Sequence, residues 1–330
     1  MTDPSPDGQF VFASEGAANR LVAGIPAAAR AIMRARDMID PAAGEVVIAV
    51  PGGWLPSALC RGEIARLAPD VVWTPCDTAQ LDGALPRAIN DSDLREQARA
   101  IIAATGKAGD GIVSRHINRP ISQAMSRLCL RWRGMRPAHA TLAAALIGMA
   151  MLLALLFGGA PGALIGASLF QLASIVDGVD GEVARATHRA SARGAMWDSM
   201  VDALTNIGFV AGLSYNVFAR GDTAAALAGT AGFVILAAGK IILGRQARRD
   251  GGDFTFDALK ARFRQRPSPL RQWLIWITMR DFYALAACLI VLSGGAALLL
   301  YAFAVVAAGW FVVLFATLRG ERASTKGAPL

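Results

Sequence analysis

The sequence predicts an α-helical membrane protein in which a small α/β cytoplasmic domain precedes a six-helix transmembrane bundle. The first observation is the composition: 54% of the 330 residues are hydrophobic and only 18% are charged. This composition is more apolar than that of a typical soluble protein. The second is the distribution of charge. Residues 1–110 carry charge at ordinary density, whereas runs without Asp, Glu, Lys or Arg follow at 138–176, 203–219, 223–239 and 282–318.

Residues 1–110 are predicted to form the α/β domain. The apolar, β-branched run Glu45–Val50 stops at a Pro-Gly-Gly turn, which is typical of a strand. A helical pattern follows over Pro56–Leu67, and Asp70–Trp73 has the composition of a second strand. An Ala- and Arg-rich helix is expected earlier, over Ile25–Met38. Strand, helix and strand in this order favour a parallel βαβ unit.

Residues 111–136 are predicted to form an amphipathic basic juxtamembrane helix. Apolar side chains recur there every three or four residues, and arginines alternate with them. This pattern places an apolar face opposite a basic one, as in helices that lie on an anionic membrane surface. An ordinary juxtamembrane linker would account for the same pattern.

Residues 137–320 are expected to form the bundle, followed by a tail over 321–330. About 20 apolar residues cross the hydrocarbon core as a helix, and the sequence offers six such segments: 138–158, 162–182, 195–219, 223–244, 280–294 and 296–317. Arginines gather on one side of this bundle. The positive-inside rule then predicts a multi-pass protein of the inner (cytoplasmic) membrane with both termini in the cytoplasm. The loop 250–278 is expected to be an interfacial amphipathic segment.

Four aspartates interrupt the second and third predicted membrane segments. Asp177 and Asp180 are three residues apart, and Asp198 and Asp202 are four apart, so each pair shares one helix face. Only a short turn joins the two helices, which makes them antiparallel neighbours. We therefore expect the four carboxylates to converge just inside the cytoplasmic boundary. Carboxylates in a membrane segment are costly, and a functional site is the default interpretation.

Four carboxylates at close range repel each other unless protons or cations neutralise them. Oxygen ligands favour hard ions such as Mg²⁺ or Mn²⁺. Such an ion clamps a diphosphate and offsets the charge that develops on its leaving group. The small residues Gly181, Ala184 and Gly194 leave room for a ligand beside the helix backbone, although close helix–helix packing would explain them equally well.

The same stretch resembles the signature of the CDP-alcohol phosphatidyltransferase family. The resemblance rests on eight positions at fixed spacing: Asp177, Asp180, Gly181, Ala184, Arg185, Gly194, Asp198 and Asp202. It covers roughly residues 111–320 and implies six membrane helices. The implied reaction is the metal-dependent transfer of a phosphoryl-alcohol (phosphatidyl-type) group from a CDP-alcohol to an acceptor alcohol, with release of CMP, in phospholipid or phosphodiester synthesis.

The resemblance also implies residue roles. Asp177, Asp180 and Asp198 ligate the metal, and Asp202 joins this metal site as the general base that takes the acceptor proton. The expected contacts with the CDP part of the donor come from five positions: Gly181, Ala184, Arg185, Gly194 and Thr141. The last of these ends a Pro-x-x-x-Thr run that is similar to the Pro-Asn-x-x-Thr of the family, with Ala138 in place of Asn.

Two cations are candidates for binding the phosphate of a phosphorylated acceptor. Lys240 lies near the cytoplasmic end of the fourth predicted segment, and Arg280 opens the fifth. For Lys240 the alternative is a side chain that snorkels to the membrane interface. For Arg280 the alternative is a position that simply flanks the membrane segment.

The junction over 110–119 is similar to that of one branch of the family, the di-myo-inositol phosphate phosphate synthases. In this branch a nucleotidyltransferase domain precedes the transferase, and an inositol or polyol phosphate is the implied acceptor. The run Arg20–Pro26 resembles a nucleotidyltransferase segment that ends in Gly-x-Pro. The glycine-rich phosphate loop that should precede it is not recognisable over 12–17. We therefore expect a degenerate domain without activity.

The net charge of +8 suits nucleic-acid binding in general, but the basic residues flank the apolar runs, so no nucleic-acid partner is expected. The expected partners are a CDP-alcohol donor, a small or lipid alcohol acceptor, membrane lipid and a second copy of the chain in a homodimer. Two other hypotheses stay open. One is a bifunctional enzyme whose N-terminal domain makes the CDP-alcohol, and the other is a membrane transporter or scaffold.

Overall fold

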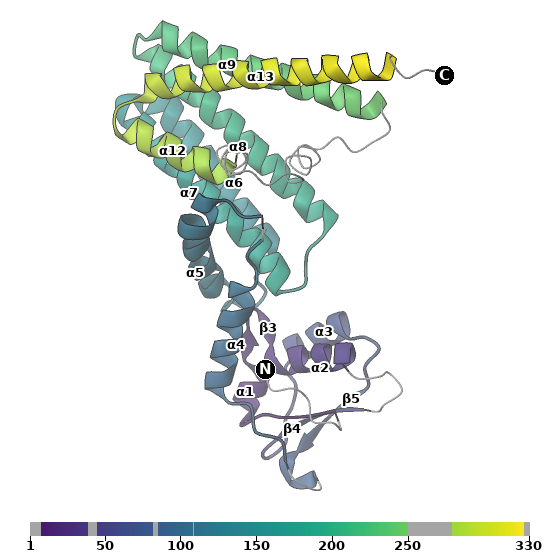
Figure 1. Cartoon of the computed structure of the whole chain (residues 1–330). Helices are drawn as coiled ribbons and strands as arrows, with labels where there is room; N and C mark the ends of the chain where they lie inside the picture. Colours follow the sequence, from purple (N-terminus) through teal and green to yellow (C-terminus); the bar gives the residue numbers. More distant parts are fainter. Residues whose placement is uncertain (1–7, 39–44, 82–84, 108, 250–278, 327–330) are drawn as a thin grey trace. The chain divides into compact units, whose positions relative to one another are not determined.

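The computed structural model describes residues 8–38, 45–81, 85–107, 109–249 and 279–326 (Figure 1). The chain forms two compact units: residues 1–108, 121–139 and 179–191 make the first, and residues 109–120, 140–178 and 192–330 make the second. The first unit thus combines an N-terminal α/β domain with two segments from the helical part of the chain. The interfacial segment expected over 250–278 lies outside the described residues.

A three-stranded parallel sheet forms the centre of the N-terminal domain. Its strands are β1 (Gln9–Val11), β4 (Val46–Val50) and β5 (Trp73–Asp77), in the order β1-β4-β5. The helix α3 (Ala58–Leu67) connects β4 to β5, which confirms the predicted parallel βαβ unit. The second strand begins at Trp73, where the prediction ended it, because the ladder pairs Val46 with Trp73 and continues to Asp77.

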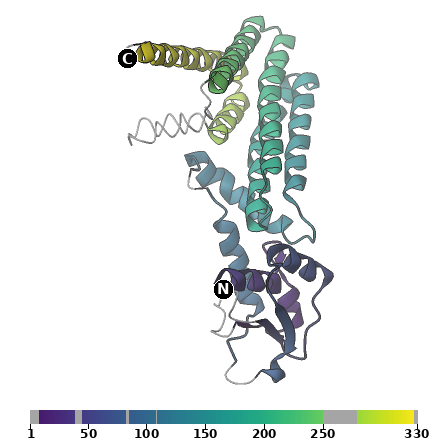
Figure 2. The same cartoon turned by 90° about the vertical axis from the view of Figure 1, so that its right-hand side faces the viewer.

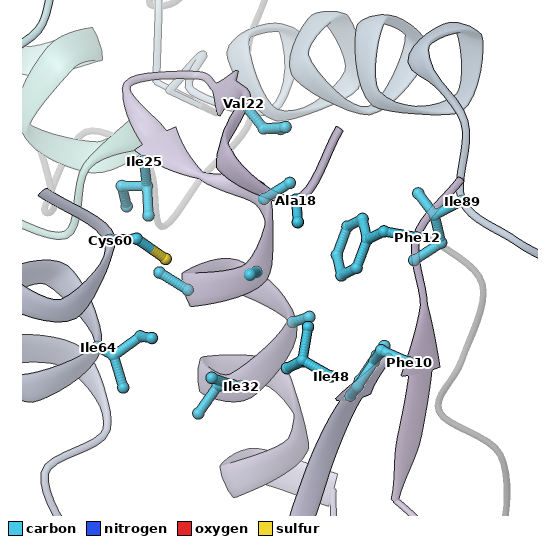
Figure 3. Packing of buried hydrophobic residues seen from close by; sticks show 14 of the residues in the cluster. Phe10, Phe12, Ala18, Val22, Ile25, Ile32, Ile48, Cys60, Ile64 and Ile89 are labelled. Carbon is cyan, nitrogen blue, oxygen red and sulfur yellow. The ribbon is translucent and has the colours of Figure 1, made fainter. Parts of the chain in front are cut away.

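A short hairpin and further helices complete this domain. They are α1 (Glu15–Asn19), β2 (Leu21–Val22), β3 (Ile25–Pro26), α2 (Ala27–Met38), η1 (Thr78–Gln80) and α4 (Asp91–Ala103). Figure 3 shows side chains from the sheet, the hairpin and the helices in one apolar core, among them Phe10, Phe12, Ile25, Ile32, Ile48 and Ile64. Most core residues of α2 are alanines, so its backbone packs close to its neighbours.

The basic juxtamembrane helix is shorter than the sequence predicted. It consists of η2 (Ser114–Asn118) and α5 (Arg119–Cys129). Beyond α5 the backbone N–H of Trp132 donates to the carbonyl of Cys129 at 3.0 Å, and Gly134 adopts a φ of +82°. This left-handed conformation is one that glycine adopts readily. The chain therefore turns before α6 instead of continuing as a helix to residue 136.

In the described part of the chain, six helices follow. They are α6 (Pro137–Phe157), α7 (Gly159–Ala186), α8 (Ala192–Ala219), α9 (Thr223–Arg249), α12 (Arg280–Leu292) and α13 (Ala296–Lys326). By length and composition, α6 and α7 are able to cross a membrane, and the stretches Thr223–Gly239 and Ala296–Val312 are shorter apolar helices. A mostly helical fold with a small α/β region is thus confirmed, and six membrane crossings stay a prediction.

One apolar core links these helices within the second unit. Phe170 of α7 stacks on Phe209 of α8 with ring centroids 4.1 Å apart. Buried residues of the other helices join this core: Leu155 of α6, Ala225 of α9, Val291 of α12 and Leu300 of α13. In addition, α13 runs along α9, as both views show (Figure 1, Figure 2). The shared core fixes α8, α12 and the first part of α7 relative to one another.

Candidate active site

The helix α7 carries the first two aspartates of the predicted site. Asp177 and Asp180 are one turn apart on it, and Asp180 is 6% exposed. A Cβ at Gly181 would lie 3.0 Å from Nη1 of Arg185, so the missing side chain lets Arg185 lie back along the helix. The Nε of Arg185 donates to the carbonyl of Thr105 at 2.8 Å. The predicted small residue Gly181 and the predicted cation Arg185 therefore lie close together.

The helix α8 carries the other two aspartates. Gly194, Asp198 and Asp202 follow one another at steps of four, which places them on one face of the helix. Asn206, a further step of four along α8, donates its side-chain N–H to Oδ1 of Asp202 at 3.5 Å. The side chains of Asp198 and Asp202 are both half-buried.

Arg280 opens α12 and joins carboxylates from two other helices. Its Nη1 lies 3.0 Å from Oδ1 of Asp177 and also contacts Oδ1 of Asp202. Only 12% of the Arg280 side chain is exposed. Asp177 and Asp202 thus converge on one cation, which offsets the repulsion between two neighbouring negative charges. The sequence placed Arg280 at the acceptor phosphate, whereas in the structure its guanidinium lies on the carboxylates.

A buried polar network holds the start of α12. Gln171 donates to Oδ1 of Asn118 at 2.9 Å, and the side-chain N–H of Asn118 lies 3.3 Å from Oδ1 of Asp281. Ser174 also donates to this carboxylate oxygen, at 3.3 Å. Because Asp281 follows Arg280, the network orients the residue that reaches the carboxylates. Sequence reasoning missed it, although Gln171 and Ser174 are polar residues in an otherwise apolar run just before Asp177.

A second buried contact that the sequence did not reveal lies within the first unit. Glu182 of α7 is fully buried, and each of its carboxylate oxygens accepts a hydrogen bond of 2.6 Å from a serine of α5. The two donors, Ser122 and Ser126, are four residues apart and share one helix face. The polar face of α5 is therefore the one that packs on α7. An acidic residue inside the signature stretch was the signal for this contact.

Two further predicted site residues, Thr141 and Lys240, lie on α6 and α9. Thr141 is near the start of α6, and Lys240 lies on α9, although its side chain is outside the described part of the structure. Within the residues that the structure describes, no group of three or more His, Cys, Asp or Glu side chains is arranged to hold a metal ion. Asp177 and Asp202 nevertheless bring carboxylate oxygens to a shared cation, and such oxygens are the ligands that hard divalent ions prefer.

A family model and several known proteins match parts of this chain. The model of the CDP-alcohol phosphatidyltransferase family matches residues 135–262. The chain is 34% identical over 144 residues to the bifunctional IPC transferase and DIPP synthase of Thermococcus kodakarensis, a match that covers 43% of the chain and 29% of that protein. Proteins of the same name match from Archaeoglobus fulgidus, with 38% identity over 120 residues, and from Rubrobacter xylanophilus, with 35% over 180 residues.

The matches to the Archaeoglobus fulgidus and Rubrobacter xylanophilus proteins cover 36% and 53% of the chain. The chain thus spans only 23% to 35% of the length of these three relatives. Their shared name confirms the expected branch of the family. All eight signature positions, from Asp177 to Asp202, fall inside the matched residues 135–262. Residues 135–262 of the chain are therefore similar to the CDP-alcohol phosphatidyltransferase family, which supports a transferase enzyme.

Proposed function

We propose that the protein transfers a phosphoryl-alcohol group from a CDP-alcohol to an acceptor alcohol and releases CMP. The observation that carries this proposal is the convergence of Asp177 and Asp202 on one buried cation, Arg280. These residues come from three helices, so the fold itself brings the charges together. Enzymes of this family are generally dependent on divalent metals, and Asp177, Asp180, Asp198 and Asp202 are the proposed ligands of Mg²⁺ or Mn²⁺.

The bound metal would neutralise the diphosphate of the donor and stabilise CMP as it leaves. Asp202 takes the proton from the acceptor hydroxyl, and the resulting oxygen attacks the phosphorus that carries the donor alcohol. The phosphorus–oxygen bond to CMP breaks, and one phosphodiester and one CMP form. Arg185 lies close to Gly181, since a Cβ at that glycine would be 3.0 Å from its Nη1, and a guanidinium is suited to donate to phosphate oxygens of CDP. Ala184, Gly194 and Thr141 complete the proposed CDP contacts.

The acceptor in this proposal is an inositol phosphate or another polyol phosphate. The name that the relatives share includes a DIPP synthase, and the junction over 110–119 is similar to that branch. Lys240 stays the proposed acceptor-phosphate ligand. Arg280 would also serve there if the bound metal takes its place on the carboxylates, since a guanidinium released from them is suited to phosphate.

We infer that the N-terminal domain makes no CDP-alcohol of its own. Ser14 ends the loop after β1 by capping α1, and its hydroxyl accepts from the backbone N–H of Ala17 at 3.1 Å. The loop is thus closed by its own helix, and residues 12–17 contain no Lys or Arg. A phosphate-binding loop needs free backbone N–H groups and a cation. The bifunctional alternative predicts pyrophosphate release from CTP by the full-length protein, and we expect none.

The proposed location is the inner membrane, with several crossings and with both termini and the active site on the cytoplasmic side. The support is the gathering of arginines around residues 111–136, 185–193, 245–249 and 319–322, which the positive-inside rule assigns to the cytoplasm. Membrane lipid and a second copy of the chain are proposed as partners. Cysteine-accessibility labelling in intact cells, with single cysteines in the α7–α8 turn and the α8–α9 turn, distinguishes the two sides.

The experiment that tests the proposed function is CMP release by the purified full-length protein, with Mg²⁺ and a panel of CDP-alcohols and polyol phosphates. Asp202→Asn keeps the shape of the side chain and removes the base, so we expect a loss of about 100-fold or more in kcat. Asp222→Asn is the matched control, because Asp222 caps the start of α9 through the N–H of Ala225 and Asn caps a helix equally well. A transporter or scaffold would show no CMP release with any donor.

A further inference from the structure

The last turn of α7 ends in a pattern that leaves several backbone carbonyls directed outward. The N–H of Arg189 donates to the carbonyl of Ala184 at 2.9 Å, and the N–H of His188 lies 3.4 Å from the carbonyl of Arg185. His188 adopts a φ of +52°. This is a Schellman motif, which satisfies carbonyls one turn back but not those of the final residues. The carbonyls of 186–188 therefore need donors from elsewhere.

Two arginines of the N-terminal domain supply these donors. Arg30 of α2 is 4% exposed, and its Nη2 donates to the carbonyl of Ala186 at 2.6 Å. Arg66 of α3 donates to the next two carbonyls, through Nη2 to Thr187 at 2.9 Å and through Nη1 to His188 at 3.1 Å. Three successive carbonyls thus accept from two guanidinium groups. Cations are also favourable at this end of a helix, because the helix dipole is negative there.

Both arginines are held in place by their own domain. Arg30 also donates to the carbonyls of Val22 at 2.7 Å and Ala23 at 3.0 Å. Burial lowers the pKa of Arg30 to about 10, and the Glu63 carboxylate opposes this shift, so the side chain is charged at neutral pH. Glu63 is 7% exposed and accepts from Nε and Nη2 of Arg66 at 3.0 and 2.6 Å. It also forms an ion pair with Arg189, beyond the end of α7.

The hairpin of the same domain packs tightly on the end of α7. Gly24 has a φ of +86°, and a Cβ there would lie 2.7 Å from a methyl of Leu130 and 3.0 Å from the methyl of Thr187. Only glycine fits this approach. The carbonyl of Thr105, just after α4, accepts from Nε of Arg185. The N-terminal domain therefore contacts both the last turn of α7 and Arg185, one of the residues proposed to bind CDP.

We infer that the N-terminal domain is a positioning module for the donor site, in which Arg30 and Arg66 are positioning residues that hold the last turn of α7 in register. The inference rests on the proposed function, because Gly181, Ala184 and Arg185 lie within two turns of the held carbonyls on the same helix. Because Arg30 is buried and donates to a carbonyl at the end of α7, this domain has a role in the alignment of that helix end. It acts on the affinity for the CDP-alcohol and leaves the proton transfer to Asp202.

The experiment compares Arg66→Ala with Arg36→Ala in the full-length protein. Arg36 is the matched control, because its Nη1 donates to the carbonyl of Leu67 at 2.6 Å, at the end of α3 inside the N-terminal domain. For Arg66→Ala we expect the KM for the CDP-alcohol to rise about tenfold or more while kcat changes less than about twofold. Arg66→Lys should recover part of this loss, because a single ammonium still reaches one carbonyl. Arg36→Ala should leave both constants near wild type.

Two further measurements do not depend on turnover. The Kd for CDP, measured calorimetrically with Mg²⁺, should rise with Arg66→Ala and not with Arg36→Ala, and hydrogen exchange over residues 181–191 should accelerate in the same variant alone. If the wild type releases no CMP, the proposed function fails, and these two measurements still decide the positioning role. An Arg66→Ala protein with unchanged KM, Kd and exchange would overturn the inference. If Arg66→Ala does not fold, Arg30→Lys takes its place, and we expect the same changes in KM, in the Kd for CDP and in hydrogen exchange.

Discussion

Replacement of Glu182 by alanine should destabilise the protein strongly, although the residue has no proposed role in the chemistry. Its carboxylate is fully buried and accepts two hydrogen bonds of 2.6 Å, from Ser122 and Ser126. Alanine removes both acceptor oxygens at once. The serine hydroxyls then lose their partners in a place that water does not reach, and a small cavity forms between α5 and α7.

The magnitude follows from the number of contacts. A hydrogen bond to a charged group contributes about 1.5–3 kcal/mol, and a buried donor left without a partner costs about 1–3 kcal/mol. Two such contacts predict a loss of about 3–6 kcal/mol in the free energy of unfolding for Glu182→Ala. Glu182→Gln keeps one acceptor oxygen and a side chain of the same shape, so its loss should be about 1–2 kcal/mol. Ser126→Ala removes one donor and should fall between these values.

The assay is thermal unfolding of the purified protein in detergent, followed by circular dichroism at one heating rate. A change of 1 kcal/mol moves Tm by about 2–4 °C in chains somewhat shorter than this one, so we expect a fall of several degrees. Glu96→Ala is the matched control, since Glu96 is an exposed residue of α4 and its loss should change Tm little. If Glu182→Ala and Glu96→Ala unfold at the same temperature, the buried carboxylate does not stabilise the fold and the reasoning is refuted.

Three other predictions concern helix ends and the hairpin. Asn216→Leu should lower Tm by several degrees, because the Asn216 amide donates to the carbonyls of Leu155 at 2.8 Å and Gly159 at 2.7 Å; an unchanged Tm would show that other donors satisfy them. Gly24→Ala should destabilise by about 1–2 kcal/mol from its positive φ alone, with more from the clash at 2.7 Å, and wild-type stability would contradict the close approach. Burial lowers the pKa of His188, and nearby arginines add to the effect, so the folded state binds fewer protons than the unfolded one. The contribution of His188 to stability should therefore be fully present above about pH 6.5 and be lost progressively at lower pH. Because Asn also tolerates a positive φ, His188→Asn should remove this part of the dependence of Tm on pH.

The helices were predictable because charge and glycine mark their ends. The uncharged run that starts after Pro137 became α6, and the Arg-Gly-Asp break over 220–222 separates α8 from α9. The parallel βαβ unit was predictable for a similar reason, since Glu45–Val50 is β-branched and ends at a Pro-Gly-Gly turn. In these cases a local pattern determines a local structure.

The contacts at the candidate site were not predictable in the same way. The sequence showed that Asp177 and Asp202 lie on faces of two helices, but the ion pair with Arg280 depends on where α12 packs. The sequence predicted an apolar face for α5, whereas the structure buries its serines. The reason is that a buried, charged Glu182 requires hydrogen-bond donors. The contacts of Arg30 and Arg66 with the end of α7 join residues more than a hundred positions apart, and no spacing in the sequence reports such a pair.

The most direct test of the central claim is ³¹P NMR of the full-length protein with a CDP-alcohol, a polyol phosphate and Mg²⁺. Because the proposed reaction breaks one bond of the diphosphate and forms one phosphodiester, CMP and the new phosphodiester should appear in equal amounts as the donor disappears. Asp177→Asn and the addition of EDTA should each stop both signals. Donor that stays intact with every acceptor, or CMP that forms equally fast in Asp177→Asn, would contradict the assignment of these aspartates to the active site.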